Sequence, residues 1–218
     1  MSDEATTSDL HPVEVLKLEA ERRKIEAEAE LAELRAEDSR RAYYDDWASP
    51  IYYGRFYFDA SVNSGSVKMF MESMERFATL NPGADITLIL NSPGGSVFDG
   101  FALFDKLRSL SARGHRIVTE CHGMAASMAS ILMQAGDRRV MGPESFQMLH
   151  EVSTGAIGKA SELADTAKLA ERLTARAADI YARRGTLSAA EFLERMERRD
   201  YWLEATECLE LGLVDEIA

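Results

Sequence analysis

Two short segments of the chain contain the residue types that acyl transfer requires. Residues 91–96 read Asn-Ser-Pro-Gly-Gly-Ser and follow an apolar run, so their glycines turn the chain outward at the end of an expected strand. Residues 123–128 read Gly-Met-Ala-Ala-Ser-Met and place Ser127 where a second strand gives way to a helix. The first segment can present free backbone N–H groups to an oxyanion, and the second can supply a hydroxyl nucleophile. Together they predict a serine peptidase.

Each segment also has a purely structural interpretation. A serine at the start of a helix more often caps that helix, and glycine turns between strands and helices often hold no ligand. The surroundings of Ser127 differ from the Gly-x-Ser-x-Gly elbow of α/β-hydrolases, because Ala125 and Ala129 stand in the glycine positions. If Ser127 opens a helix, the dipole and free N–H groups at that N-terminus favour an oxyanion beside it.

A serine nucleophile needs a base, and the chain has four histidines: His11, His115, His122 and His150. His11 lies in the N-terminal tail, and His115 is expected in an exposed turn. His122 is only five residues before Ser127 and is the rival candidate. His150 is favoured, because a side chain at the end of an expected strand can reach across to the start of another element.

The third member of a triad would be a carboxylate that holds the tautomer of the imidazole. The chain has 37 acidic residues, so spacing alone cannot select one. Asp200 is the attractive candidate, since it follows two arginines and precedes the apolar run Tyr201–Leu203, at an expected boundary between surface and core. The alternative is that Asp200 is an exposed acidic residue with no catalytic role.

Length and composition narrow the class of protein. The 218 residues are enough for one good-sized core, and two full domains would be crowded. Hydrophobic residues at 46% and charged residues at 28% are typical of a soluble globular protein. The net charge of −12 disfavours nucleic acids and anionic membranes as partners.

Targeting and metal-binding signals are not found in the sequence. Residues 1–10 are acidic and polar, unlike a secretory signal, and no apolar run approaches the length of a membrane span. The two cysteines, Cys121 and Cys208, make no disulfide framework, and no Cys/His cluster has zinc spacing. We expect a cytoplasmic protein without a metal or cofactor.

The chain is expected to have three parts. Residues 1–11 are expected to be a disordered tail. Residues 12–54 combine a helix rich in Ala, Glu, Arg and Leu with an aromatic linker, and the helix is either a solvated tether or a partner-binding element. Residues 55–218 alternate between strand and helix patterns and form the expected α/β peptidase domain.

Within this domain, the apolar spacing predicts elements joined as βαβ units. A capping box at Ser188 and Glu191 also opens a helix. The main expected strands are 56–58, 86–90, 117–119, 139–141, 146–149 and 201–203, and the main expected helices are 64–80, 97–114, 128–135 and 159–184.

Five segments, in order and at similar spacing, resemble the proteolytic subunit of the Clp protease (ClpP) family: 90–95, 123–128, 147–150, 199–203 and 212–215. The resemblance implies Ser127 as the nucleophile, His150 as the general base and Asp200 as its orienting partner. It also implies that the N–H groups of Gly95 and Met128 form the oxyanion hole.

The same resemblance implies a crotonase-like ββα spiral and a ring of copies, commonly two stacked heptamers around a proteolytic chamber. Residues 159–184 would be the helix that stacks the rings. The chain departs from the family at Glu151-Val152, where a Gln-Pro pair is usual, and at Ala129, which is more often glycine. The N-terminal charged helix differs from the axial loops of the family. Possible partners are an ATPase unfoldase or, as for ClpP-like phage peptidases, an assembling capsid.

Two other functions are compatible with the same fold. A crotonase-type enzyme acting on acyl-CoA thioesters would use the same backbone oxyanion hole with catalytic carboxylates. A ring-forming assembly scaffold would use the N-terminal helix to recruit a partner and would have no titratable active site.

Overall fold

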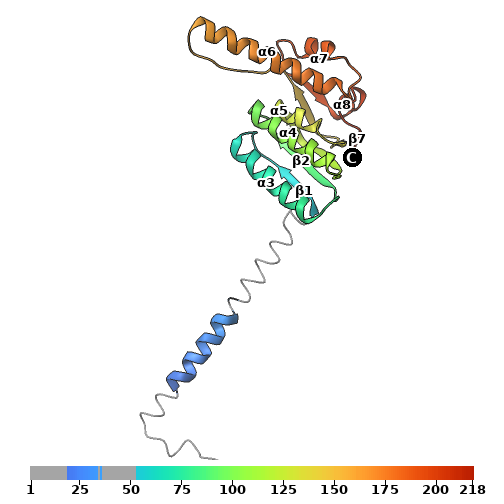
Figure 1. Ribbon diagram of the computed structural model, residues 1–218. Helices are drawn as coiled ribbons and strands as arrows, with labels where there is room; N and C mark the ends of the chain where they lie inside the picture. The colour runs from blue at the N-terminus through green and yellow to red at the C-terminus, as the bar shows by residue number, and fades with distance from the viewer. Residues whose placement is uncertain (1–18, 34, 36–52) are drawn as a thin grey trace, which may run out of the picture. The chain divides into compact units, whose positions relative to one another are not determined.

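The computed structural model describes residues 19–33, 35 and 53–218 (Figure 1). The chain divides into two units, Met1–Ser49 and Pro50–Ala218. Within the described residues, no helix is both long enough and apolar enough to cross a bilayer.

The first unit contains a charged helix over residues 19–33, and all of its side chains are exposed. The Arg22 and Glu26 side chains, one helical turn apart, form an ion pair with 2.8 Å between Nε and Oε1. Residues 19–33 of the charged segment are therefore helical. The expected tail at 1–11 and most of the aromatic linker lie outside the described residues.

The second unit is built on a mostly parallel sheet in the order β1-β2-β3-β4-β7, with β5 paired to β3 and β6 paired antiparallel to β5. The parallel neighbours β1 to β4 are joined by helical crossovers, as the βαβ pattern predicted. The strands are β1 (Arg55–Phe58), β2 (Ile86–Ser92), β3 (Ile117–Ala126), β4 (Arg138–Met141), β5 (Phe146–Leu149), β6 (Tyr201–Glu204) and β7 (Glu216–Ile217).

Strand β3 is longer than its apolar start at 117–119 predicted. Its first half pairs with β2 and β4, and its last residues pair with β5, with Ala126 opposite Met148. The register between β2 and β3 shifts after Leu90. The extension matters for the site because it carries the chain to Ser127 alongside β5, the strand that ends just before His150.

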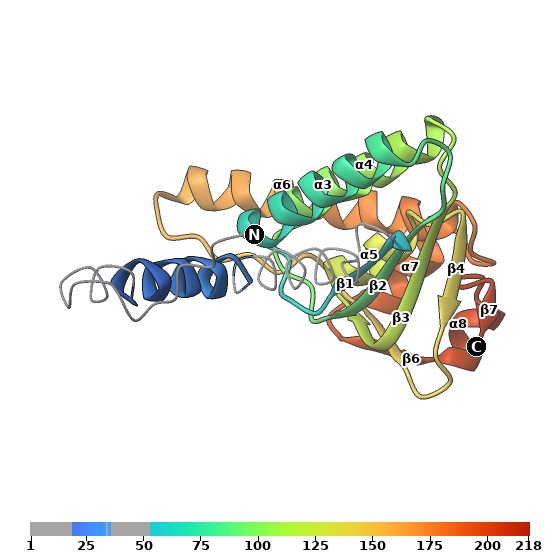
Figure 2. The same ribbon diagram turned by 90° about the horizontal axis from the view of Figure 1, so that it is seen from below.

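Helices cover the sheet and supply most of the remaining core. Helices α3 and α4 lie side by side along one face of the sheet (Figure 2). The residues predicted at helical spacing on α3, such as Phe70 and Phe77, are buried. The helices are α3 (Ser64–Leu80), α4 (Val97–Ala112), α5 (Met128–Met133), α6 (Ala160–Ala182), α7 (Ala189–Met196) and α8 (Ala205–Glu210).

Side chains fix several helix starts. Asn63 accepts hydrogen bonds from the N–H groups of Gly65 and Ser66 at the start of α3. The capping box that the sequence predicted at Ser188 and Glu191 is present at the start of α7. These local signals explain why α3 and α7 begin where their sequences indicate.

Helix α6 differs along its length. The buried residues, including Ala177, Ile180 and Tyr181, all lie in its C-terminal half. In its N-terminal half, Leu163 and Leu169 are 42% and 40% exposed. The predicted apolar stripe is therefore packed within the chain only over its second half.

One histidine prediction is wrong. His115 was expected in an exposed turn, but it is 4% exposed. Its Nδ1 lies 2.9 Å from the carbonyl oxygen of Ala84, so a polar backbone partner compensates for its burial.

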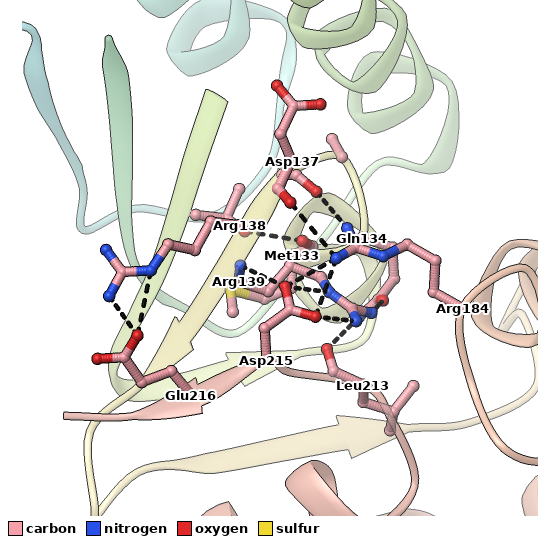
Figure 3. Close-up of polar contacts among 12 residues, drawn as sticks. Met133, Gln134, Asp137, Arg138, Arg139, Arg184, Leu213, Asp215 and Glu216 are labelled. Atoms are coloured by element: carbon pink, nitrogen blue, oxygen red, sulfur yellow. Dashed lines mark hydrogen bonds and ion pairs between the residues drawn. The ribbon is translucent and has the colours of Figure 1, made fainter. Parts of the chain in front are cut away.

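A polar cluster around the buried side chain of Arg139 joins β4 to Asp215 and to Arg184, which follows α6 (Figure 3). Arg139 is 2% exposed, and its Nη2 lies 2.7 Å from Asp215 Oδ1. Arg184 donates to the same carboxylate at 2.8 Å, and Gln134 accepts from Arg139 at 2.6 Å. Burial acts to raise the pKa of Asp215, but the hydrogen bonds and charges of the two arginines outweigh it and hold that pKa below its ordinary value.

Candidate active site

Ser127 lies at the turn between β3 and α5, in a conformation that few non-glycine residues adopt. Its φ and ψ are 55° and −121°. Its N–H donates to the Met148 carbonyl at 2.8 Å, and its own carbonyl accepts from the Ser130 N–H at 3.0 Å and the Ser130 hydroxyl at 2.6 Å. Its side chain makes no capping hydrogen bond to α5. The backbone is held on both sides, which leaves the hydroxyl available for another partner.

The glycine turn of residues 93–95 packs directly against this serine. Gly94 has φ +86°, and a Cβ there would lie 2.5 Å from the Ala126 oxygen and 2.8 Å from the Ser127 Cβ. Only glycine permits this approach. Gly95 also has a positive φ, +145°. Two backbone hydrogen bonds to Val62, each 2.8 Å long, hold the turn: the Val62 N–H donates to the Gly94 carbonyl, and the Ser96 N–H donates to the Val62 carbonyl.

Two backbone N–H groups, one in the glycine turn and one directly after Ser127, are free to bind a ligand. Gly95 is exposed, and Met128 occupies the first position of α5, where the N–H has no intrahelical acceptor. Within the described part of the chain, neither N–H donates to a protein acceptor. Their availability is what an oxyanion site requires.

His150 follows β5 and contacts the serine. Its Nε2 lies 2.7 Å from the Ser127 Oγ, and its side chain is 21% exposed. The rival His122 is 59% exposed and has its Nε2 3.5 Å from Glu120 Oε2. The structure thus brings Ser127 together with His150 and gives His122 a different partner.

Asp200 lies on the other side of the imidazole. The antiparallel pairing of β5 and β6 places Leu149 opposite Tyr201, so the residues just beyond each strand end, His150 and Asp200, are neighbours. Asp200 Oδ1 is 3.6 Å from His150 Nδ1, and the Asp200 side chain is 61% exposed. This separation is longer than a hydrogen bond.

A contact that sequence reasoning missed holds the loop before Asp200. Glu151 accepts a hydrogen bond from the backbone N–H of Arg198, with 3.0 Å between Oε2 and N. Arg198 has φ 56°, another left-handed conformation in a non-glycine residue. Glu151 directly follows His150, but no local sequence signal indicates that its side chain reaches a residue 47 positions further on.

The described residues contain no group of three or more His, Cys, Asp or Glu side chains placed to hold a metal ion. Cys121 and Cys208 are buried free thiols. Burial raises the pKa of each to about 12, so both are neutral near pH 7.

The fold and these contacts describe an α/β protein with a hydrogen-bonded serine and histidine, the arrangement of enzymes that use an activated hydroxyl. The model of the Clp protease family matches residues 42–218. Similar proteins include the ATP-dependent Clp protease proteolytic subunits of Bacteroides fragilis, 38% identical over 141 residues, and of Porphyromonas gingivalis, 39% identical over 139 residues. The ATP-dependent Clp protease proteolytic subunit 1 of Chlamydia trachomatis is 34% identical over 167 residues.

These matches differ in how much of each protein they cover. They take in 64%, 63% and 75% of this chain, and 66%, 61% and 85% of the three relatives in the same order. The chain therefore spans less than two thirds of the first two relatives. Because the family model covers more than half of the chain, this protein belongs to the Clp protease family. The predicted α/β ClpP fold is thereby confirmed.

Proposed function

We propose that this protein is a serine endopeptidase that cleaves unfolded or assembly-associated proteins. The observation that carries the proposal is the distance of 2.7 Å between Ser127 Oγ and His150 Nε2. A hydrogen bond of this length lets the imidazole accept the hydroxyl proton as the oxygen attacks a carbonyl. The acyl-CoA alternative relies on carboxylates, so this serine–histidine contact favours the peptidase.

In the proposed mechanism, Ser127 attacks the peptide carbonyl while His150 takes its proton through Nε2. The N–H groups of Gly95 and Met128 stabilise the oxyanion of the tetrahedral intermediate. His150 then gives the proton to the leaving amine, and a water molecule repeats the sequence on the acyl-enzyme. Asp200 favours the His150 tautomer that is protonated on Nδ1. The Asp200 carboxylate also stabilises the imidazolium that forms when His150 takes the Ser127 proton.

We also propose that the protein acts as a ring of copies, with a heptamer or two stacked heptamers as the expected assembly. The apolar side chain of Leu163, exposed near the start of α6, supports a contact between copies. An ATP-dependent unfoldase or an assembling capsid would then supply the substrate. The buried free thiols Cys121 and Cys208 favour the reducing cytoplasm as its location.

Hydrolysis of an unstructured protein tests the catalytic proposal. Ser127→Ala should lower the rate by about 10⁴-fold or more, because the nucleophile is lost. Ser109→Ala is the matched control, since Ser109 is an exposed serine on α4 away from the glycine turn. Hydrolysis by purified Ser127→Ala at the parental rate would rule out the assignment.

A further inference from the structure

A groove outside the reacting groups lies between α4 and α6. It has a volume of about 410 Å³. Its apolar lining includes Phe98 and Phe101 from α4 and Leu169 and Leu173 from α6. Phe98 is 65% exposed and Leu169 is 40% exposed, although both are large apolar side chains. Such a surface gains stability when another apolar group covers it.

One end of this groove lies next to the candidate active site. Phe98 is the second residue of α4 and comes three residues after Gly95 in the chain. On the other wall, Thr174 follows Leu173 and accepts a hydrogen bond from the Val152 N–H at 2.9 Å. Val152 is two residues beyond His150, so both walls begin close to the residues that would react with a peptide.

The α6 wall also carries unneutralised positive charge. Arg172 and Arg176 line the groove and are one helical turn apart, which places them on the same side of α6. Among the described residues, neither guanidinium has a carboxylate or hydrogen-bond partner. By contrast, Arg139 and Arg184 share Asp215, and Arg113 pairs with Glu75.

An apolar groove with free guanidinium groups on one wall is complementary to a specific kind of peptide. A third arginine, Arg183, lines the same wall at the C-terminal end of α6. Apolar side chains would cover the phenyl and leucine surfaces, and a carboxylate would bind Arg172 or Arg176 with charge-assisted hydrogen bonds. The groove also contains one carboxylate, Asp105, on the α4 wall. It lies two helical turns beyond Phe98, away from the end next to the glycine turn.

We propose that this groove selects the substrate: it binds an extended peptide segment in which an apolar side chain is followed by Asp or Glu. The inference rests on the proposed peptidase function, because it names the substrate class of that site. Arg172 and Arg176 are specificity-determining residues in this account, and they contact the substrate away from the bond that is cleaved. A basic residue at the same peptide position is rejected by like charge.

Matched fluorogenic peptides test the proposal. Each set contains three peptides with the same apolar sequence, which differ only in carrying Glu, Gln or Lys at one position. Further sets place this residue at other positions, on both sides of the cleaved bond. At the best position, kcat/KM for the Glu peptide should exceed that for the Lys peptide by about fivefold or more, the ratio expected for a partly exposed charge pair. Arg172→Glu with Arg176→Glu should reverse the preference, and the corresponding Gln variants should abolish it.

Arg116→Glu is the control for added negative charge, because Arg116 is exposed in the turn before β3 and does not line the groove. It should leave the Glu-to-Lys ratio unchanged. Equal cleavage of the three peptides at every position, or an unchanged ratio in the charge-reversed variant, would overturn the proposal. A smaller particle mass in that variant, with loss of cleavage of all peptides alike, would instead identify the groove as a contact between copies and would also overturn it.

Binding separates this inference from the proposed function. Fluorescence anisotropy of the same peptides on Ser127→Ala measures the groove without hydrolysis. If Ser127→Ala binds the Glu peptide preferentially but the parent protein hydrolyses no peptide, the proposed peptidase function is wrong and the proposed groove specificity stands. If the parent protein hydrolyses all three peptides without any charge preference, the peptidase function stands and the groove specificity is wrong.

Discussion

The two sides of the His150 imidazole are built differently. On one side, Ser127 Oγ lies 2.7 Å away, and the Ser127 backbone is fixed by the pairing of β3 with β5 and by Ser130. On the other side, Asp200 lies 3.6 Å away, with its side chain 61% exposed. The nucleophile is held by the sheet, whereas the carboxylate is held by a loop.

This difference indicates where small displacements should matter most. The pairing of β3 with β5 and the close packing of the glycine turn both restrain the position of Ser127. The loop that carries Asp200 is held in part by the hydrogen bond from the Arg198 N–H to Glu151. Because the Asp200 side chain is exposed, solvent can screen the charge of its carboxylate. We therefore expect substitutions on the serine side to cost more activity than substitutions on the carboxylate side.

Among substitutions that leave Ser127 and His150 in place, the largest effect is expected from Gly94→Ala. The new Cβ would lie within 2.5 Å of the Ala126 oxygen, so the glycine turn must move away from Ser127. Displacement of the oxyanion donors should lower kcat/KM by about 10²–10³-fold. Steady-state hydrolysis of a fluorogenic peptide measures this effect.

Gly83→Ala is its control, because Gly83 also has a positive φ of +77° but a Cβ there would meet nothing within 4 Å. It should cost about 1 kcal/mol of stability and leave kcat/KM unchanged. Equal loss of activity in both variants would show that backbone strain, not the approach to Ser127, determines the result.

Asp200→Asn should have a smaller effect, about 10²-fold in kcat. The amide keeps the size of the side chain but removes the charge that stabilises the imidazolium. Glu197→Gln removes a nearby exposed carboxylate from the same loop and should leave kcat unchanged. A loss in Asp200→Asn as large as that in Ser127→Ala would contradict the view that the carboxylate side is the weaker one.

Glu151→Ala should reduce kcat by about tenfold or less with little change in KM, because it releases the loop without removing a reacting group. Glu151→Gln keeps an acceptor for the Arg198 N–H and should recover most of the rate. If Glu151→Gln is no better than Glu151→Ala, then the hydrogen bond to Arg198 does not position Asp200.

Asp215→Asn should change stability and leave kcat unchanged well below the melting temperature. It leaves the buried Arg139 without its counter-charge, which should cost about 3 kcal/mol, measured by denaturant unfolding. Because the folded-state pKa of Asp215 is depressed, its contribution is present above the unfolded-state pKa and is lost as the pH falls toward the folded-state pKa. The parent protein should therefore lose this contribution in acid, and Asp215→Asn should show a weaker acid dependence.

The helices and most strands could be predicted because their signals are local. Apolar spacing and capping define α3 and α7, and short apolar runs define β2 and β5. The extension of β3 could not be predicted, because residues 120–124 lack an apolar pattern and become strand through pairing with β2 and β5. The burial of His115 depends on the carbonyl of Ala84, a partner 31 residues away.

The candidate site was predictable to a similar degree. Positions at the ends of strands and at a helix start led to Ser127 and His150, and the structure brings their side chains together. Among 37 acidic residues, Asp200 becomes the neighbour of His150 through the antiparallel register of β5 and β6, which no single segment specifies. The Glu151 contact depends on the same register, so it became visible only in the folded chain. The catalytic roles of these residues remain predictions.

Mass-spectrometric mapping of a serine-directed fluorophosphonate tests the central claim most directly. The account predicts up to one label per chain, on Ser127, with labelling greatly slowed in His150→Ala and unchanged in the control His122→Ala. A label on another serine, or labelling of His150→Ala at the parental rate, would contradict it.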